Sequence, residues 1–520
     1  MTGAPMAGAV VSEPVGAAEL AETVAAAVSG GGRFAGLFAT ARDGVPALLH
    51  ALVAMPAGGA TRDGVLPGSG HLAVIPAAMD AGSAQYPALT PLVPAAAWYE
   101  REIHDMFGIE PAGHQRLDPL VLPLAPGDPP PRPGSGSSRE DADPDVSALP
   151  SHVLGEGVFT IPYGPVRSGV FESIEYLVET SGEEILHLRT RVYHKHRGLE
   201  RRLEELAPTE GVLLAERVEG TASVAHAIAF SQAIEALAGV EPPRAAEFVR
   251  VIHAELERVA CHLDSVVRHT EGSGQAVAHA RFACHKERVM RLRAQLCGHR
   301  FGRGVVVPGG VSGPLLLETA RVLAAVADLE AAFTSDARAL MATPSFLDRL
   351  RGTGRLEQDD VREHGALGPI GRASGLVDDV RVTRPYAAYG HLGFEPATEF
   401  DEGDALARQH VRLFEIHQAL HIVRQALDDL DETAVPDDPA AFAEAVPAVP
   451  DGWSIASVEA PHGELVYLVQ CEGGRLTRVK PRCASFHNLA LLPRAFVTDI
   501  FTDFVFIEAS FGLSIAGVSG

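Results

Sequence analysis

A stretch of proline, glycine, serine and acidic residues early in the chain is the feature that most constrains the fold. Residues 126–150 begin P-G-D-P-P-P-R-P-G-S-G-S-S-R-E-D and contain almost no side chain that a core could bury. Such a composition favours an extended, solvated tether. The sequence therefore predicts a disordered linker at 126–150, which separates an N-terminal domain, residues 1–125, from a C-terminal domain, residues 151–520.

The charge balance limits the kinds of partner. The 520 residues include 67 acidic and 43 basic ones, which gives a formal net charge of −24. An acidic chain lacks the basic face that binds phosphates, so we expect no binding to nucleic acid and no direct adsorption to an anionic membrane. No long uncharged apolar run and no secretory signal are apparent. We expect a cytoplasmic protein that reaches a membrane only through partners.

The five cysteines do not form a known metal or disulfide pattern. They contain no C-x-x-C pair, and their number is odd: Cys261, Cys284, Cys297, Cys471 and Cys483. This spacing argues against a disulfide framework and against a four-cysteine zinc or iron–sulfur site. The usage fits a reducing cytoplasm.

The two predicted domains differ in their secondary structure. The N-terminal domain combines one helical segment at 20–28 with short apolar runs at 48–55 and 72–76, which predicts a small α+β domain. The C-terminal domain opens with strand-like segments at 155–163, 174–180 and 185–193 and ends in β-rich segments at 457–469 and 474–481.

Helices are predicted between these strands. In 244–267 apolar residues recur at steps of three and four after two prolines, the pattern of a long amphipathic helix. Further helices are predicted at 275–299, 315–342 and 403–431. The predicted fold class is α+β, with a mainly helical C-terminal domain that has β segments at both ends.

Three motifs of the C-terminal domain resemble one family. H-R-G-L-E at 196–200, R-V-E-G-T-A-S-V-A-H at 217–226 and I-E-A-S-F-G-L-S at 507–514 resemble the large subunit of membrane-bound, energy-converting nickel–iron hydrogenases. They also resemble the D subunit of complex I. The resemblance covers nearly all of 155–515 and implies a hydrogenase-large-subunit-like fold.

Three further motifs support this resemblance. R-A-S-G-L-V-D-D-V-R at 372–381, A-P-H-G-E at 460–464 and R-V-K-P-R-C-A-S-F at 478–486 are similar to signatures of the same family. His462 stands where the family has arginine. We interpret the arginines and aspartates of these motifs as a buried ion-pair scaffold around a cleft.

The metal ligands of the hydrogenases are missing. In those enzymes two C-x-x-C pairs hold the nickel–iron centre, and the matching positions here are Glu219, Ala222, Ser510 and Leu513. A soft metal site without thiolates is chemically implausible. We therefore predict that the nickel–iron centre is absent and that this chain itself binds no metal or other cofactor.

The N-terminal domain ends in a motif of a second subunit. W-Y-E-R-E-I-H-D-M-F-G-I at 98–109, followed by Gly113 and His114, resembles the signature of the C subunit of complex I. The chain is thus similar to a fused C/D-type subunit. The carboxylates of this motif have two interpretations: a polar helix face with a cap, or a docking site for the neighbouring iron–sulfur subunit.

Glu172 is the first candidate site residue. G-P-V-R-S-G-V-F-E at 164–172 resembles a hydrogenase-type loop whose glutamate relays protons, a role that suits a carboxylate because burial raises its pKa. In complex I the same loop carries a quinone-contacting histidine, and none occurs here. The alternative is a surface or paired carboxylate.

The other candidates are polar residues of the first two motifs: His196, Arg217, Glu219 and His226. We predict a helix across 217–226, on which Glu219 and His226 face the same side, two turns apart. They act as functional groups of the cleft, or they are polar residues satisfied by ion pairs within it. In complex I this motif supplies a tyrosine to the quinone, and Gly220 stands at that position.

The resemblance implies a cytoplasmic-arm subunit of a complex I-like or formate hydrogenlyase-like, membrane-bound oxidoreductase. Its expected partners are a small iron–sulfur subunit, whose cluster faces the cleft, and integral membrane subunits of the antiporter type. Electrons would pass to a quinone-like acceptor, and any NAD site would lie in another subunit, since no nucleotide motif occurs here. The alternative is a non-catalytic structural subunit that docks these partners.

Overall fold

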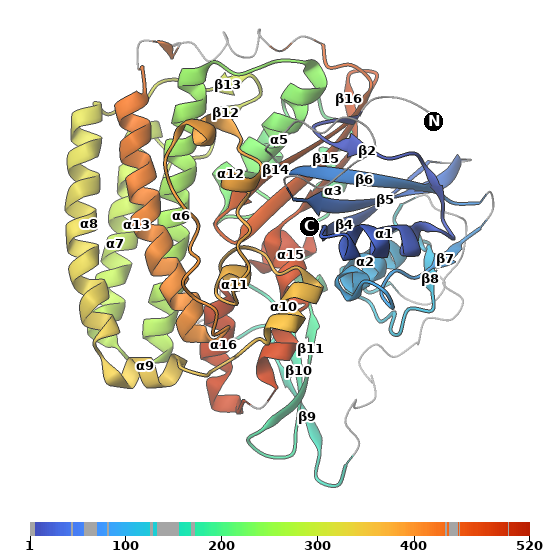
Figure 1. Ribbon diagram of the computed structural model, residues 1–520, viewed down its shortest axis with the longest axis horizontal. Helices are drawn as coiled ribbons and strands as arrows, with labels where there is room; N and C mark the ends of the chain where they lie inside the picture. The colour runs from blue at the N-terminus through green and yellow to red at the C-terminus, as the bar shows by residue number, and fades with distance from the viewer. Residues whose placement is uncertain are drawn as a thin grey trace.

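The structure is a computed structural model of the chain, with two sheets near its centre and long helices at one end (Figure 1). It describes residues 6–42, 45–56, 70–80, 83–124, 128–132, 155–167, 172–431, 434–435, 446, 448–497 and 499–520. Most of the predicted linker therefore lies outside the described residues.

The N-terminal domain is built on a five-stranded sheet. Its order is β2-β6-β5-β4, with β3 also paired to β6. The strands are β2 (Val10–Val11), β3 (Val15–Gly16), β4 (Arg33–Arg42), β5 (Val45–Met55) and β6 (His71–Ala78), and they pack with α1 (Leu20–Ser29) and α2 (Ala97–Phe107). Leu49 and Val53 of β5 enter the core with these helices, whereas Leu52 enters a different core, because successive strand residues point to opposite faces.

A second sheet joins the two predicted domains. Strands β14 (Gly452–Ala460), β15 (Gly463–Glu472) and β16 (Arg475–Arg482) form an antiparallel meander, and the N-terminal β1 (Met6–Ala7) pairs in parallel with β14. Leu52 and Val74 of the first sheet share a core with Ile455 and Leu468 of the second. Helix α5 (Ser223–Ala238) also packs on β14 and β15. The two predicted domains therefore share buried apolar surface.

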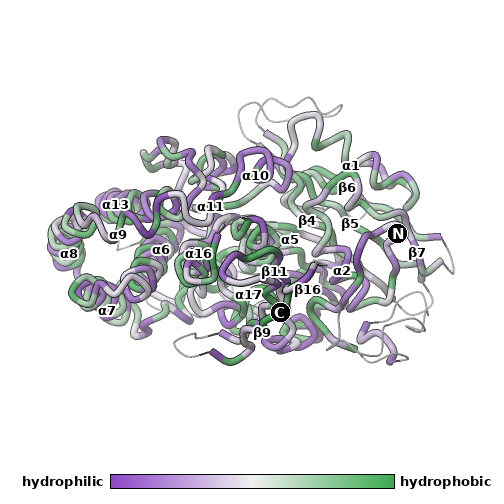
Figure 2. Tube along the Cα trace, turned by 90° about the horizontal axis from the view of Figure 1, so that it is seen from below, coloured by the Kyte–Doolittle hydropathy of each residue, from purple (hydrophilic) through white to green (hydrophobic). Residues whose placement is uncertain are grey.

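Four long helices gather at one end of the molecule, away from strands β4 to β6 (Figure 2). They are α6 (Arg244–Gly272), α7 (Ala276–Cys297), α8 (Thr319–Met341) and α13 (Ala405–Asp429). Their apolar side chains, such as Leu256, Val326 and Leu420, form a core of their own. Asp404 caps α13 by accepting a hydrogen bond from the Ala407 N–H at 2.8 Å. The four helices predicted from sequence periodicity are confirmed.

A third sheet lies beside the C-terminal segments. Its order is β11-β10-β9, formed by β9 (Phe159–Tyr163), β10 (Glu175–Thr180) and β11 (Ile185–Arg191). Helix α16 (Phe504–Phe511) packs against α6, α13 and this sheet, where the Phe504 ring lies 5.1 and 5.0 Å from the rings of Tyr163 and Tyr176. The Glu172 loop thus lies beside the C-terminal segment.

Short elements connect these parts. The short helices are α3 (Leu199–Leu203), α4 (Val212–Ala215), α9 (Pro344–Leu350), α10 (Gln358–His364), α11 (Gly368–Arg372), α12 (Val380–Thr383), α15 (Ala484–Leu489) and α17 (Ile515–Ser519). The short strand pairs are β7 (Gln85–Pro87) with β8 (Glu110–Ala112) and β12 (Val306–Val307) with β13 (Gly310–Val311).

One short piece of the predicted linker is docked. Residues 128–132 are described, and Arg132 is only 8% exposed. Its guanidinium pairs with Glu204 at 2.5 Å and lies 3.5 Å from Glu200. At this point the chain is held against the C-terminal domain, unlike a solvated tether.

The predicted fold class, α+β with a mainly helical C-terminal domain between β segments, is confirmed. The helix predicted across 217–226 is wrong at its start, because α5 begins only at Ser223. Residues 217–222 form a turn before the helix. Within the described part of the chain, none of the helices is both long and apolar enough to cross a membrane.

Candidate functional site

Glu219 lies in a buried polar cluster that the turn before α5 forms with α6 and the β14–β15 turn. His462 Nε2 lies 2.8 Å from Glu219 Oε1, and His226 Nε2 lies 3.5 Å from Oε2. The Thr221 hydroxyl donates to Oε1 at 2.9 Å, and Cys261 Sγ is 3.7 Å from His462 Nε2. With Tyr467, described next, these residues are called the Glu219 cluster.

The hydrogen bonds of His226 fix where its proton lies. The Tyr467 hydroxyl is 2.7 Å from His226 Nδ1, and both side chains are fully buried. Because the Glu219 carboxylate can only accept, His226 donates to it from Nε2, and Nδ1 forms the second hydrogen bond, with the Tyr467 hydroxyl. The predicted proximity of Glu219 and His226 is therefore correct, although a turn and a helix bring them together, and not one continuous helix.

Glu219 and His462 form an ion pair. Burial disfavours the carboxylate, but His462 and His226 outweigh this and hold the pKa of Glu219 far below its usual range. Burial also opposes protonation of His462, yet Cys261 and Glu219 raise its pKa well above the usual value. The pair can therefore hold a proton on the His462 imidazole over a wide pH range.

Glu172 binds the C-terminal segment. Its Oε2 accepts a hydrogen bond from the Ala516 N–H at 2.8 Å, and its Oε1 accepts one from the Ser514 hydroxyl at 3.1 Å. Glu172 is thus a partly buried carboxylate that accepts hydrogen bonds from the C-terminal segment, and its role as a proton relay stays a prediction. Residues 168–171 of its loop lie outside the described residues.

Arg197 and the C-terminal segment connect Glu172 to the Glu219 cluster. The Arg197 guanidinium donates to the main-chain oxygens of Val218, at 2.5 Å, and Ala516, at 2.9 Å. A Cβ on Gly517 would lie only 2.8 Å from Glu219 Oε2. The segment around Ala516 and Gly517 therefore packs between the two acids, and the glycine is required by close approach.

A cavity of about 220 Å³ lies beside Glu172. Apolar and aromatic side chains line it together with charged groups: Arg167, Glu172, Arg268, Glu271 and Glu508. Arg167 forms two hydrogen bonds with Glu508, at 2.6 and 2.9 Å, and lies over the rings of Tyr163 and Tyr176. Aromatic and apolar side chains together with fixed polar groups are features of small-molecule sites.

The two remaining candidates lie apart from this cavity. His196 lines a second, smaller cavity of about 120 Å³ with Glu102, Arg132 and Glu200. The Arg217 side chain is 46% exposed and pairs with Glu216 at 2.5 Å. The structure thus brings Glu172, Glu219 and His226 together around the C-terminal segment. His196 lies beside Gly520 at the end of this segment, and Arg217 pairs with Glu216.

The carboxylates of the motif at 98–109 bind other groups of the same chain. Glu100 accepts hydrogen bonds from the Leu89 N–H and the Thr90 side chain, and Asp105 accepts from the Leu120 and Val121 N–H groups. Glu102, in the same motif, pairs with Lys480 of β16. These contacts match the interpretation as caps and polar helix positions. Docking to an iron–sulfur subunit stays a prediction.

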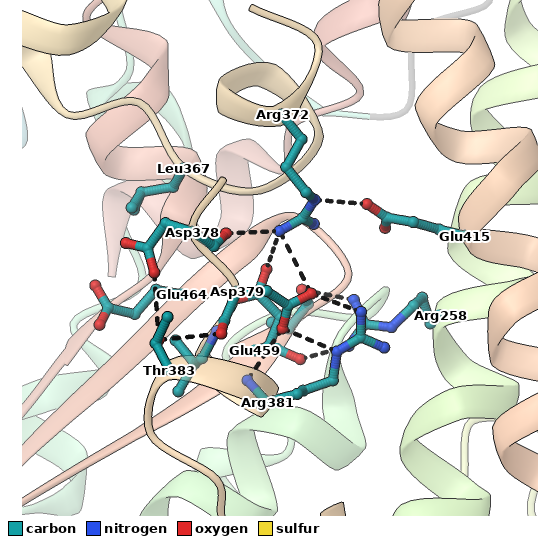
Figure 3. Close-up of polar contacts among 12 residues, drawn as sticks. Arg258, Leu367, Arg372, Asp378, Asp379, Arg381, Thr383, Glu415, Glu459 and Glu464 are labelled. Carbon is teal, nitrogen blue, oxygen red and sulfur yellow. Dashed lines mark hydrogen bonds and ion pairs between the residues drawn. The ribbon is translucent and has the colours of Figure 1, made fainter. Parts of the chain in front are cut away.

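The predicted ion-pair scaffold is present next to the β14–β15 turn that holds His462. Arg258, Arg372 and Arg381 point toward Asp379 and Glu459 (Figure 3). Arg381 pairs with Asp379 at 2.7 Å, and Arg372 pairs with Glu459 at 2.9 Å. Each of these side chains is almost completely buried, so the interpretation as a buried scaffold is confirmed.

Sequence comparisons identify the family. The family described as respiratory-chain NADH dehydrogenase, 49 Kd subunit, matches residues 274–519, and the one described as its 30 Kd subunit matches residues 69–132. Formate hydrogenlyase subunit 5 of Escherichia coli K12 is 30% identical over 422 residues, 79% of this chain and 72% of that protein. The chain belongs to the complex I C/D and energy-converting hydrogenase family.

Two relatives extend the similarity to complex I. The D subunit of NADH-quinone oxidoreductase from Saccharopolyspora erythraea is 30% identical over 403 residues, 70% of this chain and 90% of that protein. The C/D subunit of the Gluconacetobacter diazotrophicus enzyme is 27% identical over 495 residues, 87% of this chain and 82% of that protein. The resemblance predicted from the motifs is confirmed, and the chain is an oxidoreductase subunit of this family.

The residues present do not fit a nickel–iron centre. Ala222 and Leu513 offer no ligand atom, and Ser510 is engaged by Arg408 Nε at 2.9 Å. Glu219, at the remaining ligand position, is held by His462 and Thr221. An oxygen donor of this kind does not replace a thiolate for a soft metal.

His462, Tyr467 and Cys261 are cluster members that sequence reasoning missed. His462 was visible only as a replacement for arginine in A-P-H-G-E. Tyr467 follows the apolar run Leu465–Val466 in β15, and Cys261 lies on an amphipathic helix without a partner motif. A histidine at a family arginine position is the one signal that could have indicated this site.

Proposed function

We propose that this subunit helps to pass electrons from the iron–sulfur cluster of a small partner subunit to a quinone-like acceptor in the cavity beside Glu172. The observation that carries the proposal is a cavity with aromatic, apolar and charged walls, in which one of the carboxylates, Glu172, also binds the C-terminal segment that packs on the Glu219 cluster. The complex would sit on the inner face of the cell membrane, through integral membrane partners of the antiporter type.

Quinone reduction consumes protons as well as electrons. This chain has two side chains that can supply protons, one on the cavity wall and one in the Glu219 cluster. Glu172 lies on the cavity wall and can act as a general acid. The imidazole of His462 holds a second proton behind the C-terminal segment, next to Glu219. In this proposal Glu172 delivers protons to the acceptor and the Glu219 cluster provides the nearby charge pair.

Turnover of the purified complex tests the proposal. Glu172→Gln keeps the shape of the side chain but removes its titratable proton, so quinone-dependent turnover should fall roughly 10²-fold with assembly unchanged. Glu241→Gln changes an exposed glutamate in the loop before α6 and is the matched control. Undiminished turnover in the Glu172 variant, or the absence of inhibition by a quinone analogue, would refute the relay.

A non-catalytic structural role is the second candidate. It is favoured by the loss of ligand atoms at Ala222 and Leu513 and by the engagement of Glu172, Glu219 and His226 inside the chain. In that case, removing the motif at 98–109 would abolish assembly, whereas cavity variants would leave turnover unaffected. In either case we predict no stoichiometric nickel, and elemental analysis of the purified chain checks this.

A further inference from the structure

A network of buried ion pairs lies next to the turn that holds His462. Three arginines and four carboxylates form it, each at most 3% exposed: Arg258, Arg372, Arg381, Glu255, Asp379, Glu415 and Glu459. A fourth buried arginine, Arg412, interacts with Glu415 and Arg372 through its charge, but it donates its hydrogen bonds to the main-chain oxygens of Arg408 and Phe511. These residues come from α6, α11, α12, α13 and β14 and the turns beside them. In a water-free environment every unmatched charge is costly, so the pairing within this set decides which groups are ionised.

Each arginine of the network is closest to a different carboxylate. Arg258 Nε lies 3.1 Å from Glu255, Arg372 Nε lies 2.7 Å from Glu415, and Arg381 Nη2 lies 2.7 Å from Asp379. These pairings account for all three cations.

Glu459 is the carboxylate that remains. Its only ion-pair contact among the described residues is Arg372 Nη1, at 2.9 Å, and the same nitrogen lies 3.6 Å from Asp379. The Val380 N–H adds one hydrogen bond at 3.2 Å. Two carboxylates therefore share one nitrogen of a guanidinium that Glu415 already engages, the arrangement that favours a protonated acid.

The other polar groups near Glu459 are engaged by other partners or contact only its main chain. The Tyr386 hydroxyl contacts only its main chain, and Tyr389 donates to Glu255. Across the β14–β15 pair, Glu464 has its own cations, Arg33, Arg384 and Arg482. On the α13 side, His262 pairs with Glu415 at 2.8 Å, and burial lowers the pKa of His262 to about 4. The proton therefore does not reside on this histidine at neutral pH.

We propose that Glu459 is the carboxyl of this set that binds and releases a proton, so that the arginine–carboxylate set is a buried proton-binding site distinct from the cavity beside Glu172. Burial and Asp379 raise the pKa of this carboxyl to about 7, in agreement with the geometry. Glu459 is the penultimate residue of β14, next to the turn that carries His462, and Arg258 donates to the main-chain oxygens of Glu459 and Ala460. A change of charge here thus acts on the hairpin that holds the Glu219 cluster.

Infrared difference spectroscopy of the purified full-length chain tests the proposal without any electron acceptor. A protonated carboxyl band should titrate near pH 7 in the wild type and be missing in Glu459→Gln. The matched control is Asp499→Asn, because burial raises the pKa of half-buried Asp499 to about 6. That control should lose a lower transition and keep the one near pH 7.

A band near pH 7 that persists in Glu459→Gln would overturn the proposal, and so would its absence from the wild type.

The pH dependence of stability provides a second measurement. A carboxyl whose pKa rises from 4.5 to about 7 on folding makes the fold less stable as pH rises across that window. Glu459→Gln should remove part of this loss, and an unchanged pH profile would also count against proton binding.

Discussion

The two sides of α6 face very different interiors. Toward α7, α8 and α13 it presents Leu256 and Leu263, which pack in an apolar core. Toward the β14–β15 turn it presents Glu255, Arg258 and Cys261, which meet the arginine–carboxylate set and the Glu219 cluster. One helix therefore supports a core that depends on shape and a core that depends on charge pairing.

The apolar and the charged interior should differ in the substitutions that they tolerate. An apolar core loses transfer and packing energy when a side chain shrinks, and neighbours relax partly. A charged interior loses more when one partner is removed, because the remaining charge stays buried and unpaired. The comparison predicts that charge-removing variants are the more damaging ones.

The largest effect is expected for Arg381→Met. This change leaves Asp379 and Glu255 without the guanidinium that both contact, and breaking such a buried pair costs about 3–5 kcal/mol. Chemical denaturation measures the loss. Arg355→Met, at a side chain that is 61% exposed beside Glu357, is the control and should cost under about 1 kcal/mol. Equal losses in the two variants would contradict the comparison.

A smaller loss is expected on the other side of α6. Leu256→Ala opens a cavity at a fully buried site and should destabilise the chain by about 3 kcal/mol. Val277→Ala at the start of α7, where the side chain is 74% exposed, should change little. Denaturation midpoints of both variants give the values, and a Leu256→Ala loss larger than that of Arg381→Met would reverse the order.

Gly517→Ala tests the contact between the C-terminal segment and the Glu219 cluster. The new Cβ would lie 2.8 Å from Glu219 Oε2 and 3.0 Å from Cys483 Sγ, so local overpacking of about 2 kcal/mol is expected. Gly220→Ala is the matched control, because a Cβ at Gly220 would meet no heavy atom within 4 Å. If the two variants are equally stable, the segment does not pack as described.

The Glu219–His462 pair should give a pH signature. The pKa of His462 is raised above 6.5 on folding, so its stabilising contribution is complete below pH 6.5 and is lost as pH rises toward the folded pKa. We expect a loss of about 1.5 kcal/mol from pH 6.5 to about pH 8. His462→Gln should lack this slope in thermal unfolding, and a slope that survives in the variant would exclude His462 as its source.

Cleavage within 131–147 should have the smallest effect. The first and second sheets share a core, and β1 pairs with β14, so the two pieces should stay associated and elute as one particle. Since these contacts do not depend on chain connectivity, we expect little change in the unfolding temperature. Separation of the pieces on size-exclusion chromatography would show that the shared core is too weak to hold them.

Features that depend on local residue patterns could be predicted from the sequence, and features that depend on contacts between distant segments could not. The long helices were predictable because the apolar residues of 244–267 recur with helical spacing. The start of α5 was not, because Glu219 lies in a turn whose shape depends on contacts with His462 and the C-terminal segment. The proximity of Glu219 and His226 was anticipated, but their partner Tyr467, 241 positions from His226, was not.

The sequence by itself determined the family, the α+β class, the four long helices and the loss of the thiolates. These depend on local composition, periodicity and motifs. The folded structure shows that Glu172 binds Ala516, that Glu219 pairs with His462, and that Glu459 shares Arg372 with Asp379 and Glu415. Charge pairing in a buried site depends on distances between distant segments, and a linear pattern does not contain them.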